Sequence, residues 1–442
     1  MSKFKSLKSR LVLGPWCVVL LLCFTFNPSL ICSQESKEEE SLFVARKAFE
    51  DGFYEVSLGL LEKFQKTFPN SDKKAEVGLL VGQCYFYQNK YLDALKKFEE
   101  LLAQPSSRPI HDAVYYWIAE VHFKGNNFSK AAEFYKKIID GYPKSSYFPA
   151  AYYSTGWCFL QQGRYSEALK YFRAVEEKFP KDPLARESAY KAIECLYNNK
   201  DYLQMKEDLK RYFKNYPKDL SRIPYLYFYA AEAEYYLNNF SEAVKEYSKV
   251  ISSTKDEKML ALSKLGIGWS YLKEKRYKHA EEIFAEIKEE SLEKPALGTL
   301  LLGEAIIAGE NKKFREAERI YDRILGAAAD PSVLIQAYLG KADILYSLND
   351  YDRAVSVYNL ALENISEAVS RELVDKIHYG LAWAYLKGGH FKEAIDEFQK
   401  VARQSEEKTV KVSALCQIGD AYQEAGNYPK AIEAYDSILK DY

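Results

Sequence analysis

The sequence of 442 residues predicts an all-α solenoid of about eleven antiparallel helix pairs. The first observation is a repeat. An aromatic residue, mostly followed three positions later by a small one, returns at intervals of 37 residues, with one interval of 38 and one of 40. The second is another ring seven positions further on in most repeats, on the same face of a helix. Such a period is typical of stacked hairpins that bury their apolar faces on one another. The repeated residues are Tyr54, Tyr91, Phe128, Tyr165, Tyr202, Phe240, Tyr277, Phe314, Tyr351, Phe391 and Tyr428.

Each repeat is predicted to hold two helices, an A helix before the aromatic residue and a B helix that starts at it. Nine positions before this residue the A helix carries Gly or Ala, and three positions after it the B helix carries Ala in most repeats. Small residues at both places let the two helices approach closely. The fifth repeat departs from this at both places, with Ile193 and Met205. The Gly- and Asn-rich stretches between A and B, such as "GNN" at 125–127, are short enough to require an antiparallel pair.

The early repeats end on an aromatic residue followed by proline, which stops the B helix. This ending occurs at Phe68, Tyr142, Phe179 and Tyr216 and is absent further on. We therefore expect the repeats to divide into an N-terminal array at 41–219 and a C-terminal array at 220–442, with a change of superhelical pitch or a hinge near 216–224. The 40-residue interval is expected to lengthen one helix by a turn.

Residues 1–33 are predicted to be a secretory signal peptide, and residues 34–40 a short linker. A basic head of four Lys or Arg residues precedes an apolar run from Leu11 to Phe26, which is shorter than the roughly 20 residues that span a bilayer. Two alternatives stay open. The segment could be retained as a membrane anchor, or Cys32 could be lipidated, because "SLIC" resembles a bacterial lipobox.

Composition and motifs argue against catalysis. The 62 Lys and Arg residues balance 63 Asp and Glu residues, so no strong field draws the chain to nucleic acid. The five histidines lie in five repeats without the spacing of a metal site, and no glycine motif for phosphate follows a strand. We expect no catalytic residue, no metal, no cofactor and no small-molecule substrate. Four cysteines are expected to be free and buried, because equivalent slots of stacked repeats lie too far apart for a disulfide; they are Cys84, Cys158, Cys195 and Cys416.

The repeats resemble the tetratricopeptide repeat. The resemblance rests on the small residue within helix A, the aromatic residue at the A–B turn, the Ala three positions later, the ring four positions beyond it and the proline after helix B. It covers about Ser41 to Tyr442, although the usual period is 34 residues. It implies a right-handed superhelical solenoid with one face of the A helices on its concave side. With the signal segment and the Phe/Tyr-Pro endings, the chain looks like periplasmic members of the family, among them an outer-membrane assembly lipoprotein and the Tol–Pal coordinator.

The concave face implied by the resemblance supplies the candidate partner-binding residues. Twelve positions before the turn residue the A helices are mostly apolar or aromatic, which packing between neighbouring A helices would also explain. Eight positions before it, tryptophans stand out against a mostly polar background, either as partner anchors or as covers of a seam. Such a groove suits an extended or helical segment with basic and apolar side chains. The candidates are Trp157, Trp269, Trp383, Tyr116, Tyr153, Tyr190, Glu120, Glu194 and Glu232.

These observations predict a non-catalytic protein-protein interaction scaffold that is exported to the periplasm or to the periphery of the outer membrane, with envelope proteins as partners. The alternative is a lipid-anchored structural component of an outer-membrane assembly, secretion or polysaccharide-export complex, held through Cys32. The last helix pair stops at Tyr442, one residue before the expected proline. This position predicts either a fragment or an apolar edge that another molecule covers.

Overall fold

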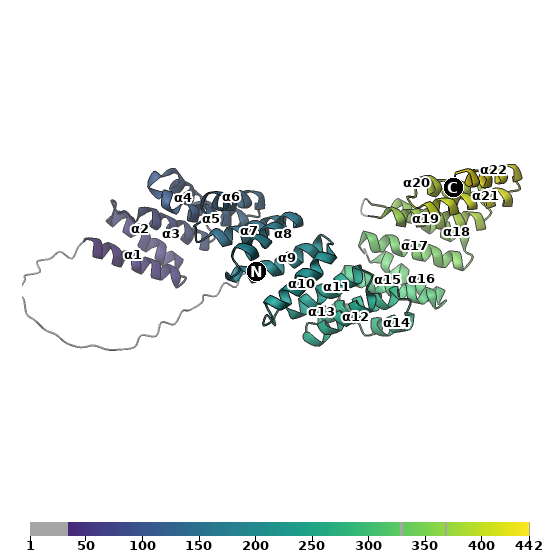
Figure 1. The fold of residues 1–442 in the computed structure, drawn as a ribbon, viewed down its shortest axis with the longest axis horizontal. Helices are drawn as coiled ribbons and strands as arrows, with labels where there is room; N and C mark the ends of the chain where they lie inside the picture. Colours follow the sequence, from purple (N-terminus) through teal and green to yellow (C-terminus); the bar gives the residue numbers. More distant parts are fainter. Residues whose placement is uncertain (1–33, 328–329, 367–368, 442) are drawn as a thin grey trace, which may run out of the picture. The chain divides into compact units, whose positions relative to one another are not determined.

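The computed structural model describes residues 34–327, 330–366 and 369–441, and over these residues it is entirely helical (Figure 1). The described part of the chain contains α-helices α1 to α22 and two short 3-10 helices, η1 (Pro105–Ile110) and η2 (Glu289–Ser291). The predicted all-α class and the pairing into eleven hairpins are confirmed. The predicted signal peptide at 1–33, including Cys32, lies outside the described residues.

The helices alternate between A and B along the chain, as the repeat predicts. The A helices are α1 (Gln34–Glu50), α3 (Lys74–Tyr87), α5 (His111–Lys124), α7 (Phe148–Gln161), α9 (Pro183–Asn198), α11 (Ile223–Tyr236), α13 (Glu257–Lys273), α15 (Lys294–Glu310), α17 (Pro331–Ser347), α19 (Arg371–Lys387) and α21 (Lys408–Glu424). The B helices are α2 (Tyr54–Thr67), α4 (Tyr91–Ala103), α6 (Phe128–Gly141), α8 (Tyr165–Lys178), α10 (Tyr202–Asn215), α12 (Phe240–Ser253), α14 (Tyr277–Ala285), α16 (Phe314–Gly326), α18 (Tyr351–Glu363), α20 (Phe391–Gln404) and α22 (Tyr428–Asp441).

The chain divides into two compact units, an N-terminal unit Met1–Ala151 and a C-terminal unit Tyr152–Tyr442, and the division falls within α7. Within each unit a B helix packs on its own A helix and on the next one, as in α3–α4–α5 and α13–α14–α15. The boundary expected between residues 219 and 220 is inferred from the type of repeat ending, and it stays a prediction. Residues 34–40, expected as a linker, are instead the first turns of α1.

Every A–B turn contains one residue with positive φ, between 57° and 85°. This left-handed residue ends helix A, because it lets backbone N–H groups return to the carbonyls of the last turn. At the second repeat, Asn89 N donates to Phe86 O and Lys90 N donates to Tyr85 O, each at 2.9 Å. Gly and Asn adopt this conformation most easily, which explains the composition of the turns.

The core of each hairpin is organised by the ring seven positions after the turn residue. Phe284 of α14 is 1% exposed and lies between Gly268 of α13 and Gly303 of α15. A Cβ atom at Gly268 would come within 2.1 Å of the Phe284 ring, and one at Gly303 within 2.6 Å. Because no real Cβ approaches so closely, the ring fixes the identity of both positions.

The fifth repeat keeps the same volume with different residues. Its ring position holds Leu209, which is smaller than the usual Phe or Tyr. Ile193 and Met205, at the two close-approach positions, are both fully buried around it, and Tyr212 also joins this cluster. The larger residues therefore fill space that the missing ring leaves, as in a volume-conserving repacking.

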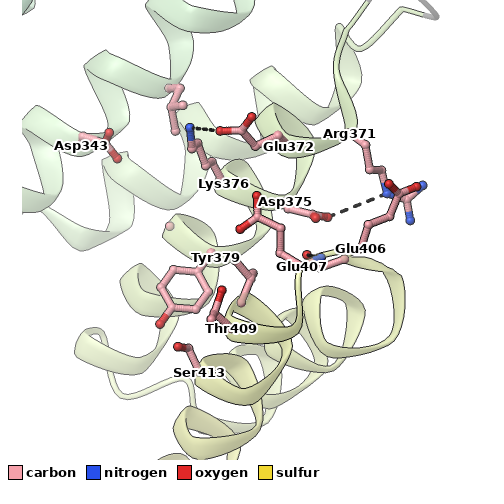
Figure 2. Close-up of a pocket in the computed structure, with 14 residues that line it drawn as sticks. Asp343, Arg371, Glu372, Asp375, Lys376, Tyr379, Glu406, Glu407, Thr409 and Ser413 are labelled. Atoms are coloured by element: carbon pink, nitrogen blue, oxygen red, sulfur yellow. Dashed lines mark hydrogen bonds and ion pairs between the residues drawn. The ribbon is translucent and has the colours of Figure 1, made fainter. Parts of the chain in front are cut away.

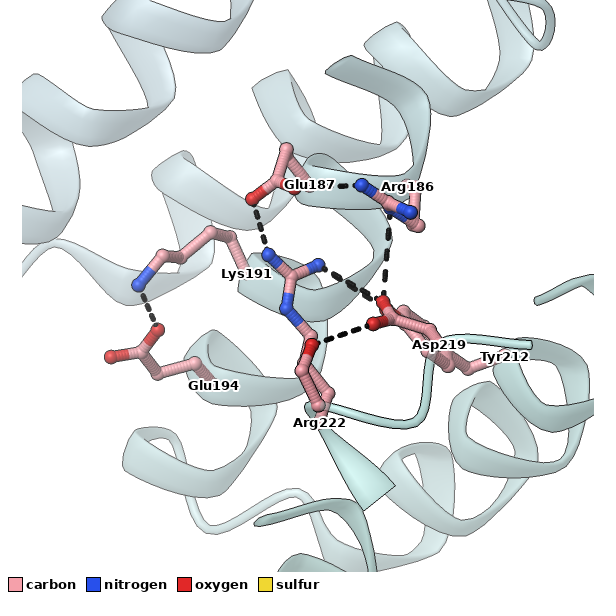
Figure 3. A network of polar contacts seen from close by, with 8 residues as sticks. Arg186, Glu187, Lys191, Glu194, Tyr212, Asp219 and Arg222 are labelled. Carbon is pink, nitrogen blue, oxygen red and sulfur yellow. Dashed lines mark hydrogen bonds and ion pairs between the residues drawn. The ribbon is translucent and has the colours of Figure 1, made fainter. Parts of the chain in front are cut away.

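The link between α10 and α11 is held by a half-buried polar network (Figure 3). Tyr212 Oη donates to Asp219 Oδ2 at 2.6 Å, and Ser221 Oγ donates to Asp219 Oδ1 at 3.0 Å. Arg222 pairs with Glu187 at 2.5 Å. These contacts favour a fixed change of geometry at 216–224 over a free hinge.

The interval of 40 residues does not lengthen a helix, contrary to the expectation. α18 has 13 residues and α19 has 17, the same lengths as α16 and α17 in the preceding repeat. The link at 364–370 is longer than the link at 327–330, so the additional residues lie between the helices.

Candidate protein-binding surface

All nine candidate residues lie on A helices and are half-buried. We call the surface formed by the positions twelve, eight and five before the turn residue the A face. In the N-terminal unit it includes Tyr116 and Glu120 of α5. In the C-terminal unit it includes Tyr153 and Trp157 of α7, Tyr190 and Glu194 of α9, Glu232 of α11, Trp269 of α13 and Trp383 of α19. Half-buried side chains of this kind are fixed by their surroundings and still present area to a partner.

Four carboxylates of the A face accept a hydrogen bond from the core ring of their own hairpin. In each pair a tyrosine hydroxyl donates to an acid fifteen residues earlier, and Tyr135 Oη lies 2.6 Å from Glu120 Oε1. The pairs are Tyr135–Glu120, Tyr247–Glu232, Tyr358–Asp343 and Tyr435–Asp420. Glu120 and Glu232, predicted as partner contacts, therefore have a structural role as well.

The residue eight positions before the turn follows the identity of the core ring. Where the ring is Phe, the residue fifteen positions earlier is Gln83, Trp157, Trp269 or Trp383. A phenylalanine leaves no hydroxyl to satisfy, so an apolar or neutral side chain can lie over it. The tryptophans are thus coupled to Phe rings, and Trp383 packs edge-on against Phe398 with 6.0 Å between centroids. Sequence reasoning missed this coupling, although the fifteen-residue spacing carries it.

Glu232 has two tyrosine donors, Tyr247 and Tyr197, the second at 3.1 Å. Within the described residues neither Lys nor Arg forms an ion pair with it. Burial raises its pKa, and the two hydroxyls act in the opposite direction. Glu194 differs, because Lys191 Nζ lies 2.5 Å from its Oε2.

The tryptophans rest partly on the core. Trp269 packs against the clusters around Phe284 and Tyr321, and its Nε1 donates to Thr299 O at 3.3 Å. Lys191 Nζ lies 4.3 Å from the ring centroid of Trp157. Lys387 lies 5.6 Å from that of Trp383. A tryptophan of this kind can cover the seam between helices and also anchor a partner, because part of its ring packs on the core while the residue as a whole is only half-buried.

A groove of about 530 Å³ opens on the A face of the C-terminal unit. Its lining includes Glu232 and Tyr236 of α11, Leu262 and Trp269 of α13, and Leu302 of α15. Tyr236 is 50% exposed and Leu262 is 38% exposed, which is unusual for large apolar side chains. The groove therefore brings together two candidate residues, Glu232 and Trp269, with exposed apolar area.

A second hollow, of about 610 Å³, lies on the A face of α17, α19 and α21 (Figure 2). Two of its carboxylates are paired, Glu372 with Lys376 at 2.6 Å and Asp375 with Arg371 at 3.8 Å. Asp343 lines the hollow, where desolvation by the surrounding walls raises its pKa to about 6 and the hydrogen bond from Tyr358 acts in the opposite direction. None of the nine candidate residues lines this hollow, which sequence reasoning did not predict.

The surface offers little chemistry beyond binding. Among the described residues no group of three or more His, Cys, Asp or Glu residues could hold a metal ion. Cys84, Cys158 and Cys195 are buried and Cys416 is half-buried, and none of these four cysteines forms a disulfide. Burial raises the pKa of Cys195 to about 12, so it is a poor nucleophile. Over the same residues, no helix combines the length and the apolar character that crossing a bilayer requires.

Comparison with known families agrees with the geometry. Models of the tetratricopeptide repeat match residues 82–146 and 302–369, and, for a second model, 378–405 and 413–442. A family model described as outer membrane lipoprotein matches residues 149–265. The chain is a tetratricopeptide-repeat protein, with a central segment similar to outer membrane lipoproteins. Proteins of this class are protein-protein interaction scaffolds. No curated protein matches the sequence.

Solved structures with a similar fold include a tetratricopeptide repeat protein from Parabacteroides merdae. That likeness has 16% identity and a TM-score of 0.45, and covers 60% of this chain and 96% of the other. The Cut9–Hcn1 complex of the APC/C is similar at 13% identity and a TM-score of 0.44, over 92% of this chain and 88% of that one. Yeast Tom70 is similar at 13% identity and a TM-score of 0.40, over 93% of this chain and 100% of that one.

The Tyr247–Glu232 hydrogen bond is testable by removing the donor. Tyr247→Phe should lower the free energy of unfolding by about 1–3 kcal/mol at pH 7, because a buried carboxylate loses a partner. Tyr321→Phe is the matched control, since Tyr321 occupies the same place in its hairpin and Ile306 stands where the acid would be. Its effect should be small. Denaturant unfolding measures both, and equal losses would contradict the pairing.

Asp343 should make stability depend on pH between about 4 and 6. Its pKa is raised from 3.8 to about 6 in the folded state, so the folded chain holds this proton more tightly and loses stability as pH rises through this window. Asp343→Asn should gain stability relative to the wild type from pH 4 to pH 6.5. The unfolding midpoint as a function of pH measures this gain. Asp436→Asn, at an exposed site on α22, is the control. If the pH profile of Asp343→Asn runs parallel to that of the wild type, the raised pKa of Asp343 is refuted.

Proposed function

We propose that this protein is an exported scaffold of the bacterial cell envelope and that its A face binds segments of envelope proteins. The observation that supports this best is the row of half-buried aromatic and carboxylate side chains on α7, α9, α11 and α13. These side chains are oriented by hydrogen bonds and ring contacts, so they are already placed before a partner arrives. Tyr153, Trp157, Tyr190, Glu194 and Glu232 are the proposed contacts there.

The same role is proposed for the other candidates. Trp269 and Trp383 extend the A face along the C-terminal unit, and Tyr116 and Glu120 form a corresponding patch in the N-terminal unit. In that patch, the centroids of the Tyr116 and Tyr147 rings are 4.6 Å apart. We propose to treat 41–219, where most repeats end on Phe-Pro or Tyr-Pro, and 220–442, where the repeats lack this ending, as two arrays.

The proposed location rests on two features. Residues 1–33 have the composition of a signal segment, and the match to outer membrane lipoproteins covers 149–265, which includes five of the nine candidate residues. We infer a non-catalytic role in the periplasm or at the inner side of the outer membrane. Envelope proteins are the proposed partners.

Photo-crosslinking tests the binding role. A benzoylphenylalanine in place of Tyr153 or Tyr190 should crosslink to the same envelope protein in cells, because both residues lie on the A face. The same residue in place of Leu92 or Leu203, which are 84% and 70% exposed on B helices, is the control. Equal crosslinking from the controls would count against a binding face on the A helices.

A lipid anchor at Cys32 is the second candidate, favoured by the description of the matching family as outer membrane lipoprotein. It would make the protein a structural component of an outer-membrane assembly, secretion or polysaccharide-export complex. Labelled palmitate should enter the wild type and not Cys32→Ser, and globomycin should block processing. If the wild type is processed but takes up no labelled palmitate, the protein is not lipidated and the free periplasmic form is favoured.

A further inference from the structure

The chain contains an internal example of what its tryptophans can bind. Lys191 of α9 places its ammonium 4.3 Å from the ring centroid of Trp157 and 2.5 Å from Glu194 Oε2. The side chain of Lys191 is only 16% exposed. An ammonium ion is attracted to the face of an indole ring, and more so where water is excluded. Trp157 and Glu194 together thus form a cation site that the protein occupies with its own lysine.

The corresponding place at Trp269 has no such lysine. Lys191 follows Trp157 by 34 residues, and the residue 34 positions after Trp269 is Gly303. Glycine is required there, because a Cβ atom would come within 2.6 Å of the Phe284 ring. The packing of the core therefore prevents the chain from covering Trp269 as it covers Trp157.

The groove at Trp269 has a carboxyl group from a different helix. The counterpart of Glu194 there is Ile306 of α15, and the carboxyl group comes from Glu232 of α11, the A helix before α13. Glu232 lines the same groove and is held by Tyr197 and Tyr247, without an ion pair to any described Lys or Arg. The groove also contains Lys273, which is exposed and lies near enough to Glu372 to help lower the pKa of that carboxyl. Glu232 is thus an oriented carboxyl group, held by two tyrosine hydroxyls, that has no ion pair with a Lys or Arg among the described residues.

Much of the remaining wall of the groove is apolar. Leu262, Leu265, Leu302 and Val333 line it together with Phe228. A ligand that satisfies the groove therefore combines one positive charge with apolar neighbours. A lysine or arginine side chain within an apolar segment has this chemistry, because its aliphatic stem also packs on apolar surface.

We propose that the groove between α11, α13 and α15 takes a lysine or arginine side chain of a partner segment, with the cation over Trp269 and beside Glu232, and with apolar residues on either side. This inference rests on the proposed function, since it names the chemistry of the segment that the A face binds. The Trp269 groove differs in this respect from the Trp157 site, where Lys191 already lies over the ring.

Two synthetic peptides test this inference directly. The lysine peptide is Ac-Leu-Phe-Lys-Leu-Val-NH2, and the neutral peptide has norleucine in place of lysine. Calorimetric titration of the full chain should show the lysine peptide binding about tenfold more tightly, as expected for a partly desolvated cation on an indole ring next to a carboxylate. The preference should shrink as salt is raised.

Variants assign the preference to the groove. Trp269→Leu and Glu232→Gln should each reduce it to less than about twofold, whereas Leu203→Ala, at a 70% exposed site on the B helix α10, should leave it unchanged. Equal binding of the two peptides by the wild type would overturn the cation site and leave the binding role of the A face intact. Absence of binding by either peptide would also overturn it, and the crosslinks from Tyr153 and Tyr190 test the wider role separately.

Discussion

In most hairpins the fold depends on one buried ring that packs on a small residue of its own A helix, and in four repeats a glycine of the next A helix also meets that ring. Phe284 shows the arrangement most fully, since Gly268 lies on one side and Gly303 on the other. The ring fills the space that the glycines leave, and so joins its own hairpin to the next. A solenoid is stable only if each repeat is coupled to its neighbours in this way, because no single hairpin buries its apolar face alone.

The same ring also determines the chemistry of the A face. In four repeats a tyrosine directs its hydroxyl to a carboxylate fifteen residues earlier, and in three repeats a phenylalanine has a tryptophan at that position. In these repeats the core ring therefore determines whether the A face presents an oriented carboxylate or a tryptophan. Core packing and partner binding are consequently encoded by the same pairs of residues, and a change to one alters the other.

Most of the fold could be predicted from the sequence, because periodicity is a property of the sequence itself. The turn residues, the small residues and the rings specify where each helix lies. Other features could not be predicted from the repeat. The three additional residues of the long interval lie in the link 364–370, since a repeat pattern gives the length of an interval and not its place. The network around Asp219 and Arg222 joins residues from two helices, α9 and α10, with the link, so its contacts exist only in the folded chain.

The candidate surface was predictable as a set of positions, and less so as a set of roles. Position eight before the turn lies on the A face as expected, yet the roles of its residues differ. Glu120 and Glu232 accept hydrogen bonds from tyrosines of their own hairpins. Glu194 is paired with Lys191, and the same lysine lies over the ring of Trp157. These distinctions depend on side chains from neighbouring helices, which no single repeat reveals.

The ring contact at the centre of this account can be measured in solution. Nuclear Overhauser effects between the ring protons of Phe284 and the Hα protons of both Gly268 and Gly303 report whether one ring joins two hairpins. We predict strong effects to both glycines. Effects to Gly268 alone would show that the hairpins are not joined through the ring, and would contradict the account of the fold and of the A face that it supports.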